Sequence, residues 1–206
     1  VWTRNPGAEK MATLSHYVSD PEVRRRAWRN RLESPAWQAK PNAGHLALAA
    51  LDRTGRLELL ITQNVDGLHQ AAGSSAERVV EIHGTLHEVT CLDCGERAPM
   101  ERALARVRAG EDDPACRSCG GILKSATISF GQNLVARDLE RAEAAAESCD
   151  LLLAIGSTLS DPDQKAALVD RLFAKKATES TVAIVRHLVQ SPRGRRAVRG
   201  WRGWLE

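Results

Sequence analysis

Three short apolar runs, each bounded by polar or turn-forming residues, are the strongest structural signal along this chain. Leu57–Thr62, Arg78–Ile82 and Asp150–Ile155 have the length and the largely continuous apolar character of strands buried on both faces. Helical patterns precede the first run and separate the second run from the third. Strands that alternate with helices predict an α/β fold, built around a parallel sheet.

Local signals place several helices between these runs. Asp20 followed by Pro21 is a favourable N-cap and first helical residue, and Pro41-Asn42 opens a second helix through the segment HLALAALDR. A longer helix, rich in alanine, is expected at about 134–148. We therefore expect a helical module over residues 8–51, ahead of the first strand.

Composition places the chain among soluble globular proteins. Its 206 residues can form one core with a small satellite, and 43% of them are hydrophobic while 27% are charged. No apolar run approaches the roughly 20 residues of a membrane helix, and no signal peptide is visible. We expect no membrane partner.

The net charge of +3 is unevenly distributed, because residues 186–206 form a basic tail with six arginines and one acid. A solvated terminus is favoured there over a contact with nucleic acid or an acidic partner. We therefore expect that the chain does not act on nucleic acid. The sequence gives no indication of the oligomeric state.

Four of the five cysteines form two Cys-x-x-Cys pairs, with glycines directly after each pair. The pairs are Cys91/Cys94 and Cys116/Cys119. Four thiolates close a tetrahedral shell and leave no open position for a substrate, so we expect one structural zinc ion in a lobe over residues 86–125. This use of cysteine indicates a reducing compartment, and the cytoplasm is the expected location. Cys149 is expected to be a packed core residue.

Polar side chains follow the first apolar run directly. Gln63, Asn64 and Asp66 stand where the strand ends. In open α/β sheets ligands bind beyond the carboxyl ends of the strands, so these side chains are expected in a ligand cleft. A turn of the Asx type is an equally acceptable interpretation of the segment Asn-Val-Asp-Gly.

A histidine follows the second apolar run at the same kind of position. His83 ends the strand, and Gly84 gives its backbone room. A histidine with a pKa near neutrality is a natural general base, and the shared strand-end position makes His83 the candidate. His69 and His87 are expected to support the site.

The order of five motifs gives the chain a specific resemblance. TQNVDGLH, EIHG, the four-cysteine ribbon, LKSATISFG and LLLAIGSTL follow one another as in the sirtuins, the NAD-dependent protein-lysine deacylases. The resemblance runs from about Trp2 to Ser160. It implies one partial catalytic domain over residues 1–206, in which a Rossmann-like part (52–85 and 126–185) carries a smaller lobe of zinc ribbon and helical module.

The resemblance also implies a reaction and the residues that perform it. In sirtuins the carbonyl oxygen of an acyl-lysine attacks the ribose carbon that bears nicotinamide, and nicotinamide, free lysine and O-acyl-ADP-ribose result. The implied catalytic residues are His83, as base on a ribose hydroxyl, and Asn64. The implied NAD contacts are Gln63, Asn64, Asp66, Gly156 and Ser157. The implied contacts to acetylated protein lysines, by strand addition, are Ile128, Phe130 and Gly131.

The departures from the family pattern concern the cofactor's phosphates. Sirtuins carry a Gly-rich phosphate-binding loop and an Asp-Phe-Arg-Gly segment upstream of the position where this sequence starts. After Ser160 the expected apolar continuation is replaced by Asp161–Gln164, and Arg186 stands where the family has Asn. A pyrophosphate needs backbone N–H groups at a helix N-terminus, so we expect residues 1–206 alone to bind NAD weakly.

Acyl preference and alternative functions depend on few residues. Sirtuins that remove acidic acyl groups carry a Tyr-x-x-Arg pair, and Trp28 and Arg31 stand at the matching positions. We expect Trp28 to pack against a helix and Arg31 to be solvent-exposed, which favours deacetylation over desuccinylation. The alternatives are a catalytically impaired fragment that acts as a zinc-containing binding module, and an ADP-ribosyltransferase that uses the same cleft.

Overall fold

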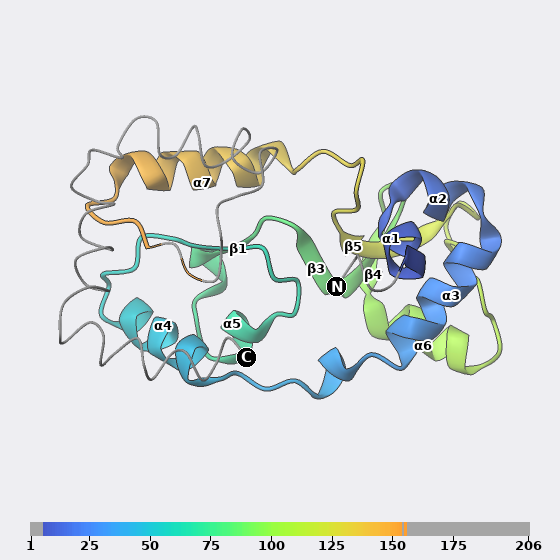
Figure 1. Cartoon of the computed structure of the whole chain (residues 1–206), viewed down its shortest axis with the longest axis horizontal. Coiled ribbons are helices and arrows are strands. Elements are labelled where there is room, and N and C mark those ends of the chain that lie inside the picture. Colours follow the sequence, from blue (N-terminus) through green and yellow to red (C-terminus); the bar gives the residue numbers. More distant parts are fainter. Residues whose placement is uncertain (1–5, 154, 156–206) are drawn as a thin grey trace. The chain divides into compact units, whose positions relative to one another are not determined.

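The computed structural model describes residues 6–153 and 155 (Figure 1). The chain divides into two compact units, residues 1–138 and 139–206. The first unit contains the described strands and the histidine and cysteine motifs. It is therefore the unit that positions the candidate site.

Helices dominate the first part of this unit. They are α1 (Pro6–Ala12), α2 (Leu14–Ser19), α3 (Pro21–Leu32), the 3₁₀ turn η2 (Pro35–Gln38) and α4 (Ala43–Arg53). Both expected helix starts are confirmed, because the Asp20 carboxylate accepts from the Glu22 N–H at 2.8 Å and the Asn42 side chain accepts from the His45 N–H at 3.1 Å. Each cap satisfies a backbone donor that the helix itself leaves unpaired.

Two short strands form a parallel pair, as the apolar runs predict. The strands are β1 (Leu60–Thr62) and β2 (Val79–Glu81), joined through α5 (Leu68–Ala71) and the 3₁₀ turn η3 (Ala76–Arg78). Leu60 is opposite Val79 and Thr62 is opposite Glu81. Parallel strands end at the same edge of a sheet, so the segments after Thr62 and Glu81 start side by side.

A second sheet is antiparallel and carries the cysteines. Its order is β4–β3–β5, with β3 (Gly84–Cys91) between β4 (Arg97–Pro99) and β5 (Leu123–Thr127). Helix α6 (Met100–Arg108) follows β4 and packs against β3 and α3. The helical segment and the zinc-ribbon segment thus share one packed region.

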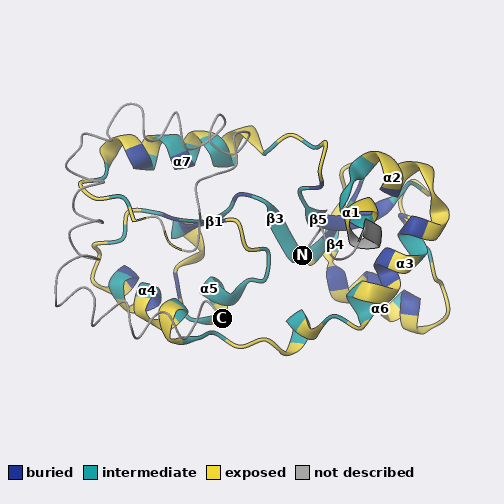
Figure 2. Cartoon of the chain, viewed as in Figure 1, coloured by how far each residue is buried: buried dark blue, intermediate teal, exposed yellow. Residues whose placement is uncertain are grey.

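The core of that region forms around a tryptophan on α3. Trp28 is completely buried and packs with Val89 of β3, Leu104 of α6 and Leu123 of β5. Figure 2 shows buried segments in dark blue on α3 and α6. The expectation that Trp28 is a packing residue is confirmed. Truncation of such a side chain to alanine typically costs about 3–5 kcal/mol, so Trp28 is a principal support of this lobe.

The third apolar run behaves differently from the other two. Helix α7 (Ala136–Ser148) forms where a helix was expected, but the described residues after it, 149–153 and 155, form no strand. The predicted strand Asp150–Ile155 is therefore wrong for these residues, and Leu151, Leu153 and Ile155 are 52–53% exposed. A strand needs a neighbour that satisfies its backbone groups, and these residues pair with no strand among residues 6–153 and 155.

The α/β class and the separate four-cysteine lobe are confirmed by the parallel pair, the antiparallel sheet and the cysteine cluster. The domain boundaries remain a prediction. Gly156, Ser157 and the basic tail lie outside the described residues. Among the described helices, none has the length and apolar character that crossing a membrane requires.

Candidate functional site

The ends of the two parallel strands bring the candidate base next to the polar segment. The Ile82 N–H donates to the Thr62 carbonyl at 3.0 Å, which extends the parallel pairing by one residue. His83 then lies beside Gln63, with its Nδ1 3.2 Å from the Gln63 carbonyl oxygen. Because a carbonyl oxygen only accepts, this contact places the proton of the neutral ring on Nδ1 and leaves Nε2 as the proton acceptor.

The segment after β1 is held in place by its own turn and by β3. The Asp66 carboxylate accepts from the Leu68 N–H at 3.0 Å, so the Asx-type turn considered from the sequence is formed. The His87 Nε2–H donates to the Asp66 carbonyl at 2.8 Å, and the Leu86 N–H donates to the Val65 carbonyl at 2.9 Å. His87 therefore supports the segment, as expected.

The two amide side chains of this segment lie at the protein surface. Gln63 and Asn64 are exposed, whereas Asp66 is half-buried. The Asn64 N–H is anchored to the Thr62 hydroxyl at 3.1 Å. The backbone at Asn64 is therefore held in place just beyond the strand end, where ligands bind in open α/β sheets.

Gly84 has a steric reason to follow His83. Its φ of +74° lies in the left-handed region, and a Cβ atom there would lie 2.0 Å from the carbonyl oxygen of Ala126. Only glycine lets β3 approach β5 this closely. The His-Gly dipeptide therefore sets the position at which the chain leaves the parallel sheet and enters the antiparallel one.

Two ionisable groups, on α5 and at the end of β2, lie in surroundings that disfavour their charged forms. Burial, and then His45, lower the pKa of His69, whose ring centroid lies 4.6 Å from that of His45. Burial raises the pKa of Glu81. In both cases the loss of hydration is the largest cause of the shift.

The four paired cysteines converge on one point. Their sulfur atoms lie within 4.8 Å of one another, with Cys91 Sγ 3.5 Å from Cys119 Sγ and Cys94 Sγ 3.7 Å from Cys116 Sγ. A tetrahedral zinc ion with Zn–S bonds of about 2.3 Å requires sulfur separations of about 3.8 Å. The donor set therefore fits one structural zinc ion.

The backbone around these cysteines is shaped for the knuckle. The Ile122 N–H donates to the Asp93 carboxylate at 3.1 Å, and a Cβ at Gly121 would lie 2.0 Å from that carboxylate. Glycine is thus required beside the second knuckle, as the sequence pattern indicates.

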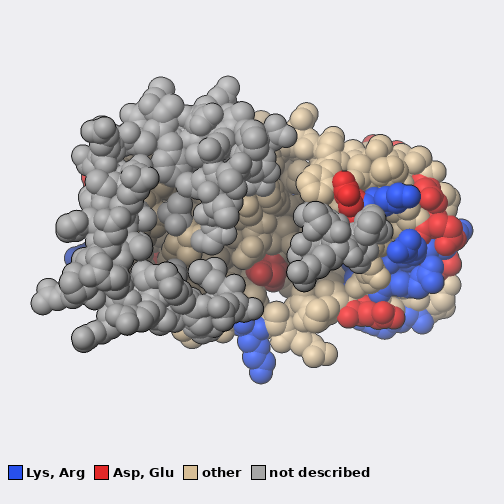
Figure 3. All heavy atoms as spheres, in the orientation of Figure 1, with Lys and Arg blue, Asp and Glu red and all other residues tan. Residues whose placement is uncertain are grey.

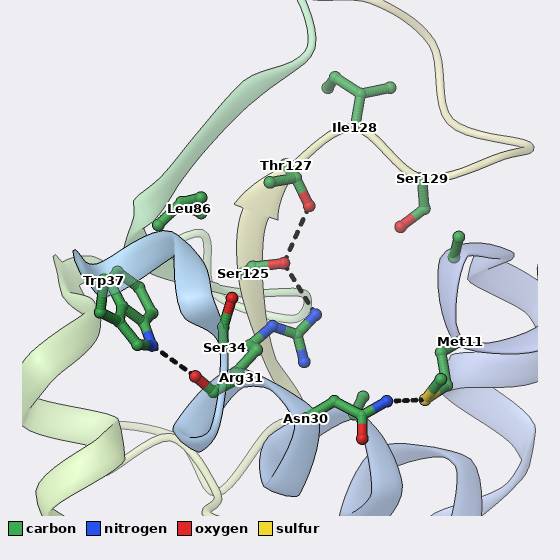
Figure 4. Close-up of a pocket in the computed structure, with 12 residues that line it drawn as sticks. Met11, Asn30, Arg31, Ser34, Trp37, Leu86, Ser125, Thr127, Ile128 and Ser129 are labelled. Atoms are coloured by element: carbon green, nitrogen blue, oxygen red, sulfur yellow. Dashed lines mark hydrogen bonds between the residues drawn. The ribbon is translucent and has the colours of Figure 1, made fainter. Parts of the chain in front are cut away.

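A pocket of about 340 Å³ opens between α3 and the end of β5 (Figure 4). Arg31 reaches into it from α3, and Ser125, Thr127 and Ile128 line it from β5 and the residue that follows. The Arg31 Nη2 donates to the Ser125 hydroxyl at 2.9 Å, and that hydroxyl lies 2.8 Å from the Thr127 hydroxyl. One wall of the pocket is therefore polar.

Arg31 is not solvent-exposed, and the expectation for this residue is wrong. Its guanidinium lies 5.2 Å from the Trp28 ring and 5.7 Å from the Tyr17 ring, and burial lowers its pKa. Its Nη1 is fully buried and has no hydrogen-bond partner within the described part of the chain. The sequence carried a signal for this: Val23, Ala27 and Arg31 follow at four-residue spacing on one helix face.

The three residues implied to contact substrate do not line one pocket. Ile128 lines the pocket with Arg31, whereas Phe130 and Gly131 border a second hollow beside α2. The backbone N–H and C=O of Phe130 already bond to Ala12 and Leu14. Strand addition by a substrate remains a prediction, and at Phe130 it would compete with those bonds.

Basic and acidic side chains are intermingled around α3 and α6 (Figure 3). Arg24 pairs with Asp113 at 2.8 Å, and Arg25 lies 3.4 Å from Asp112. The Arg24–Asp113 pair is partly buried and the Arg25–Asp112 pair is more exposed, and both offset arginine charge on α3.

Fold and site together define an α/β protein with a polar strand end that carries a histidine, and with a four-cysteine lobe. Comparison with known proteins places it more narrowly. The model of the Sir2 family matches residues 2–161, so the chain belongs to the Sir2 family.

Relatives of known name agree with this assignment. The chain is 50% identical over 159 residues to NAD-dependent protein deacetylase 2 of Streptomyces coelicolor, and 38% identical over 161 residues to NAD-dependent protein deacetylase 1 of Bradyrhizobium diazoefficiens. Each match covers 77% of this chain. The chain spans 66% and 61% of the lengths of these relatives, respectively.

Solved structures give the same fold. A Sir2 protein bound to an acetylated peptide superimposes with a TM-score of 0.69 at 29% identity, over 81% of this chain and 73% of that one. A Sir2 complex with a p53 peptide and NAD⁺ gives a TM-score of 0.67 at 32% identity, over 77% of this chain and 66% of that one.

Proposed function

We propose that this chain is the larger part of an NAD-dependent protein-lysine deacylase, with acetyl-lysine as the first acyl substrate. The observation that carries the proposal is the position of His83. It stands at the end of the parallel pair beside Gln63, and its carbonyl accepts from the Ile128 N–H of the pocket at 2.7 Å. A candidate base is thus linked by one hydrogen bond to a pocket that can take an acyl chain.

The chain's own residues have distinct tasks in this reaction. NAD, when bound, supplies the ribose carbon that accepts the acyl oxygen as nicotinamide departs. His83 Nε2 takes a proton from a ribose hydroxyl, while the Gln63 contact at Nδ1 holds the ring. Asn64 and Asp66, with Gln63, orient the nicotinamide ribose and carboxamide, and the four cysteines hold the zinc that stiffens the lobe. The cytoplasm is the proposed location.

The proposal is tested with an acetyl-lysine peptide and NAD. We expect nicotinamide, deacetylated peptide and O-acetyl-ADP-ribose in equal amounts, measured by mass spectrometry. The chain should be assayed alone and joined to an upstream Gly-rich segment of the kind that the sirtuin resemblance implies. Modified protein without O-acetyl-ADP-ribose would instead indicate ADP-ribosyl transfer. Peptide binding without any nicotinamide release from either form would indicate a binding module.

One observation favours a second candidate, removal of an acidic acyl group such as succinyl. The fully buried Nη1 of Arg31 has no partner within the described residues, and the pocket wall beside it carries two hydroxyl groups. A guanidinium in a pocket is well suited to bind a carboxylate in two hydrogen bonds. An exposed Arg31 was the argument for acetyl-lysine over succinyl-lysine. Because Arg31 is not exposed, that argument is lost.

A further inference from the structure

Strand β5 is an edge strand, and its outward carbonyls are those of odd-numbered residues. The Leu92 N–H donates to the Ile122 carbonyl at 2.9 Å, so even-numbered carbonyls face β3. Because carbonyls alternate along an antiparallel strand, those of Leu123, Ser125 and Thr127 face away from the sheet. No further strand borders this edge in the described part of the chain.

Side chains satisfy these outward carbonyls. The Tyr17 hydroxyl donates to the Leu123 carbonyl at 2.8 Å. The Lys124 ammonium donates to the Ser125 carbonyl at 3.1 Å and also to the Thr127 carbonyl. Lys124 is only 1% exposed, so water does not supply these bonds. Lys124 therefore closes the last two outward carbonyls of the strand.

A lysine is a costly choice for this task. Within residues 6–153 and 155 no carboxylate forms an ion pair with it. Burial, and then the nearby Arg31, lower the pKa of Lys124 to about 8. A buried ammonium that faces a guanidinium is weak support for stability alone. The long lysine stem, however, can reach the carbonyl three residues along the strand.

The carbonyl that Lys124 reaches belongs to the peptide group between Thr127 and Ile128. The Thr127 C=O and the Ile128 N–H are the two polar ends of one planar unit. Lys124 binds the oxygen end, and the nitrogen end donates to the His83 carbonyl at 2.7 Å. Hydrogen bonds in such a row polarise one another and strengthen. Lys124 is thus joined to the backbone of the candidate base through a single peptide plane.

We propose that Lys124 is a positioning residue for His83. It holds the Thr127–Ile128 peptide group from one side, and this group fixes the His83 backbone from the other. Thr127 and Ile128 also line the pocket. The contact from Lys124 therefore positions the His83 backbone and this side of the pocket relative to each other. The catalytic meaning of this link rests on the proposed function, whereas the link itself does not.

The link is tested by amide hydrogen exchange in the Lys124→Met and Lys124→Arg variants. We expect exchange of the Ile128 amide to accelerate by about tenfold or more in Lys124→Met, relative to the Leu104 amide within α6. Lys124→Arg, which keeps a cationic donor, should restore most of the protection. Lys40→Met, at an exposed position, is the matched control. Unchanged Ile128 exchange in a folded Lys124→Met chain overturns the proposal.

A measurement on the unsubstituted chain decides the question if Lys124→Met does not fold. The Ile128 amide resonance should follow the titration of the Lys124 side chain, with one shared midpoint near pH 8. Arg31 from α3 acts directly on Lys124, and Tyr17 from α2, with a pKa raised by burial to about 12, stays neutral there. If the Ile128 amide resonance and the Lys124 side chain titrate with different midpoints, the link is refuted.

The catalytic role has a separate readout. In the deacylation assay Lys124→Met should lower kcat with little effect on the KM for NAD, and Lys124→Arg should recover kcat. If no variant and no unsubstituted chain releases nicotinamide, the proposed function fails while the exchange result still decides the link. A wild-type kcat in folded Lys124→Met, in an assay that responds to His83→Ala, refutes the positioning role.

Discussion

The His83 Nδ1 lies 3.2 Å from the carbonyl oxygen of Gln63, across the ends of two parallel strands. The two residues are 20 positions apart in the chain, and the pairing of β1 with β2 brings them together. The contact does more than place the ring. It determines which nitrogen holds the proton, and so which nitrogen is directed at a substrate.

The tautomer of His83 is therefore a direct prediction. In the neutral ring the proton should reside on Nδ1, with Nε2 unprotonated, because only Nδ1 meets a carbonyl. Nitrogen chemical shifts of the ¹⁵N-labelled imidazole at alkaline pH distinguish the two forms. The exposed His16 supplies an unconstrained reference in the same chain. A protonated Nε2 at His83 would contradict the proposed geometry.

The cysteine cluster should hold one zinc ion per chain, and the lobe should depend on it. Replacement of Cys116 by Ser should remove the metal and lower the thermal unfolding temperature of the chain, because binding of a structural zinc contributes directly to folding. Metal content is measured by mass spectrometry. Cys149→Ser is the matched control and should keep the ion, since Cys149 is not among the four clustered sulfurs. Retention of zinc by Cys116→Ser would argue against a four-thiolate site.

Acid should weaken the fold through Asp52. The Ser75 N–H at 2.7 Å and Arg78 at 2.8 Å hold the pKa of the Asp52 carboxyl below its ordinary value of 3.8. A lowered folded-state pKa stabilises the fold fully above 3.8, and this contribution is lost as pH falls through the lowered value. The Asp52 carboxyl is almost fully ionised at about pH 5. Urea unfolding at a series of lower pH values should show a falling free energy of unfolding. In Asp52→Asn the same part of the pH dependence should be absent.

Arg31 should decide between neutral and acidic acyl groups. If the pocket binds a carboxylate, Arg31→Met should reduce the affinity for a succinyl-lysine peptide by about tenfold or more and leave acetyl-lysine binding nearly unchanged. Fluorescence anisotropy of labelled peptides measures both affinities. Arg29→Met changes an exposed arginine on the same helix and should affect neither peptide. Equal losses for both peptides in Arg31→Met would remove the support for an acidic acyl substrate.

The sequence predicted the parts of the fold that local chemistry controls. The caps at Asp20 and Asn42, the two paired strands and the cysteine cluster depend on residue types at short spacing, and all are present. The strand Asp150–Ile155 failed among the described residues because an apolar run shows the capacity to pair, while pairing itself needs a neighbouring strand. Periodicity alone does not supply that neighbour.

The site was predicted in part, for similar reasons. The position of His83 beside Gln63 follows from the shared edge of parallel strands. The buried setting of Arg31 and the edge bonds of Lys124 arise from the packing of α3 and α2 against β5, which links residues about 90 to 110 positions apart. Arginine and lysine are usually exposed, so their residue types argued for the wrong environment.

The most direct test of the account is the rate of nicotinamide release from NAD in the presence of an acetyl-lysine peptide. His83→Ala should lower this rate by about 10²–10⁴-fold, the usual range for loss of a general base, with no loss of zinc or thermal stability. His16→Ala, an exposed histidine on α2, should release nicotinamide at the unsubstituted rate. An unchanged rate in folded, zinc-containing His83→Ala would contradict the assignment of His83 as the base.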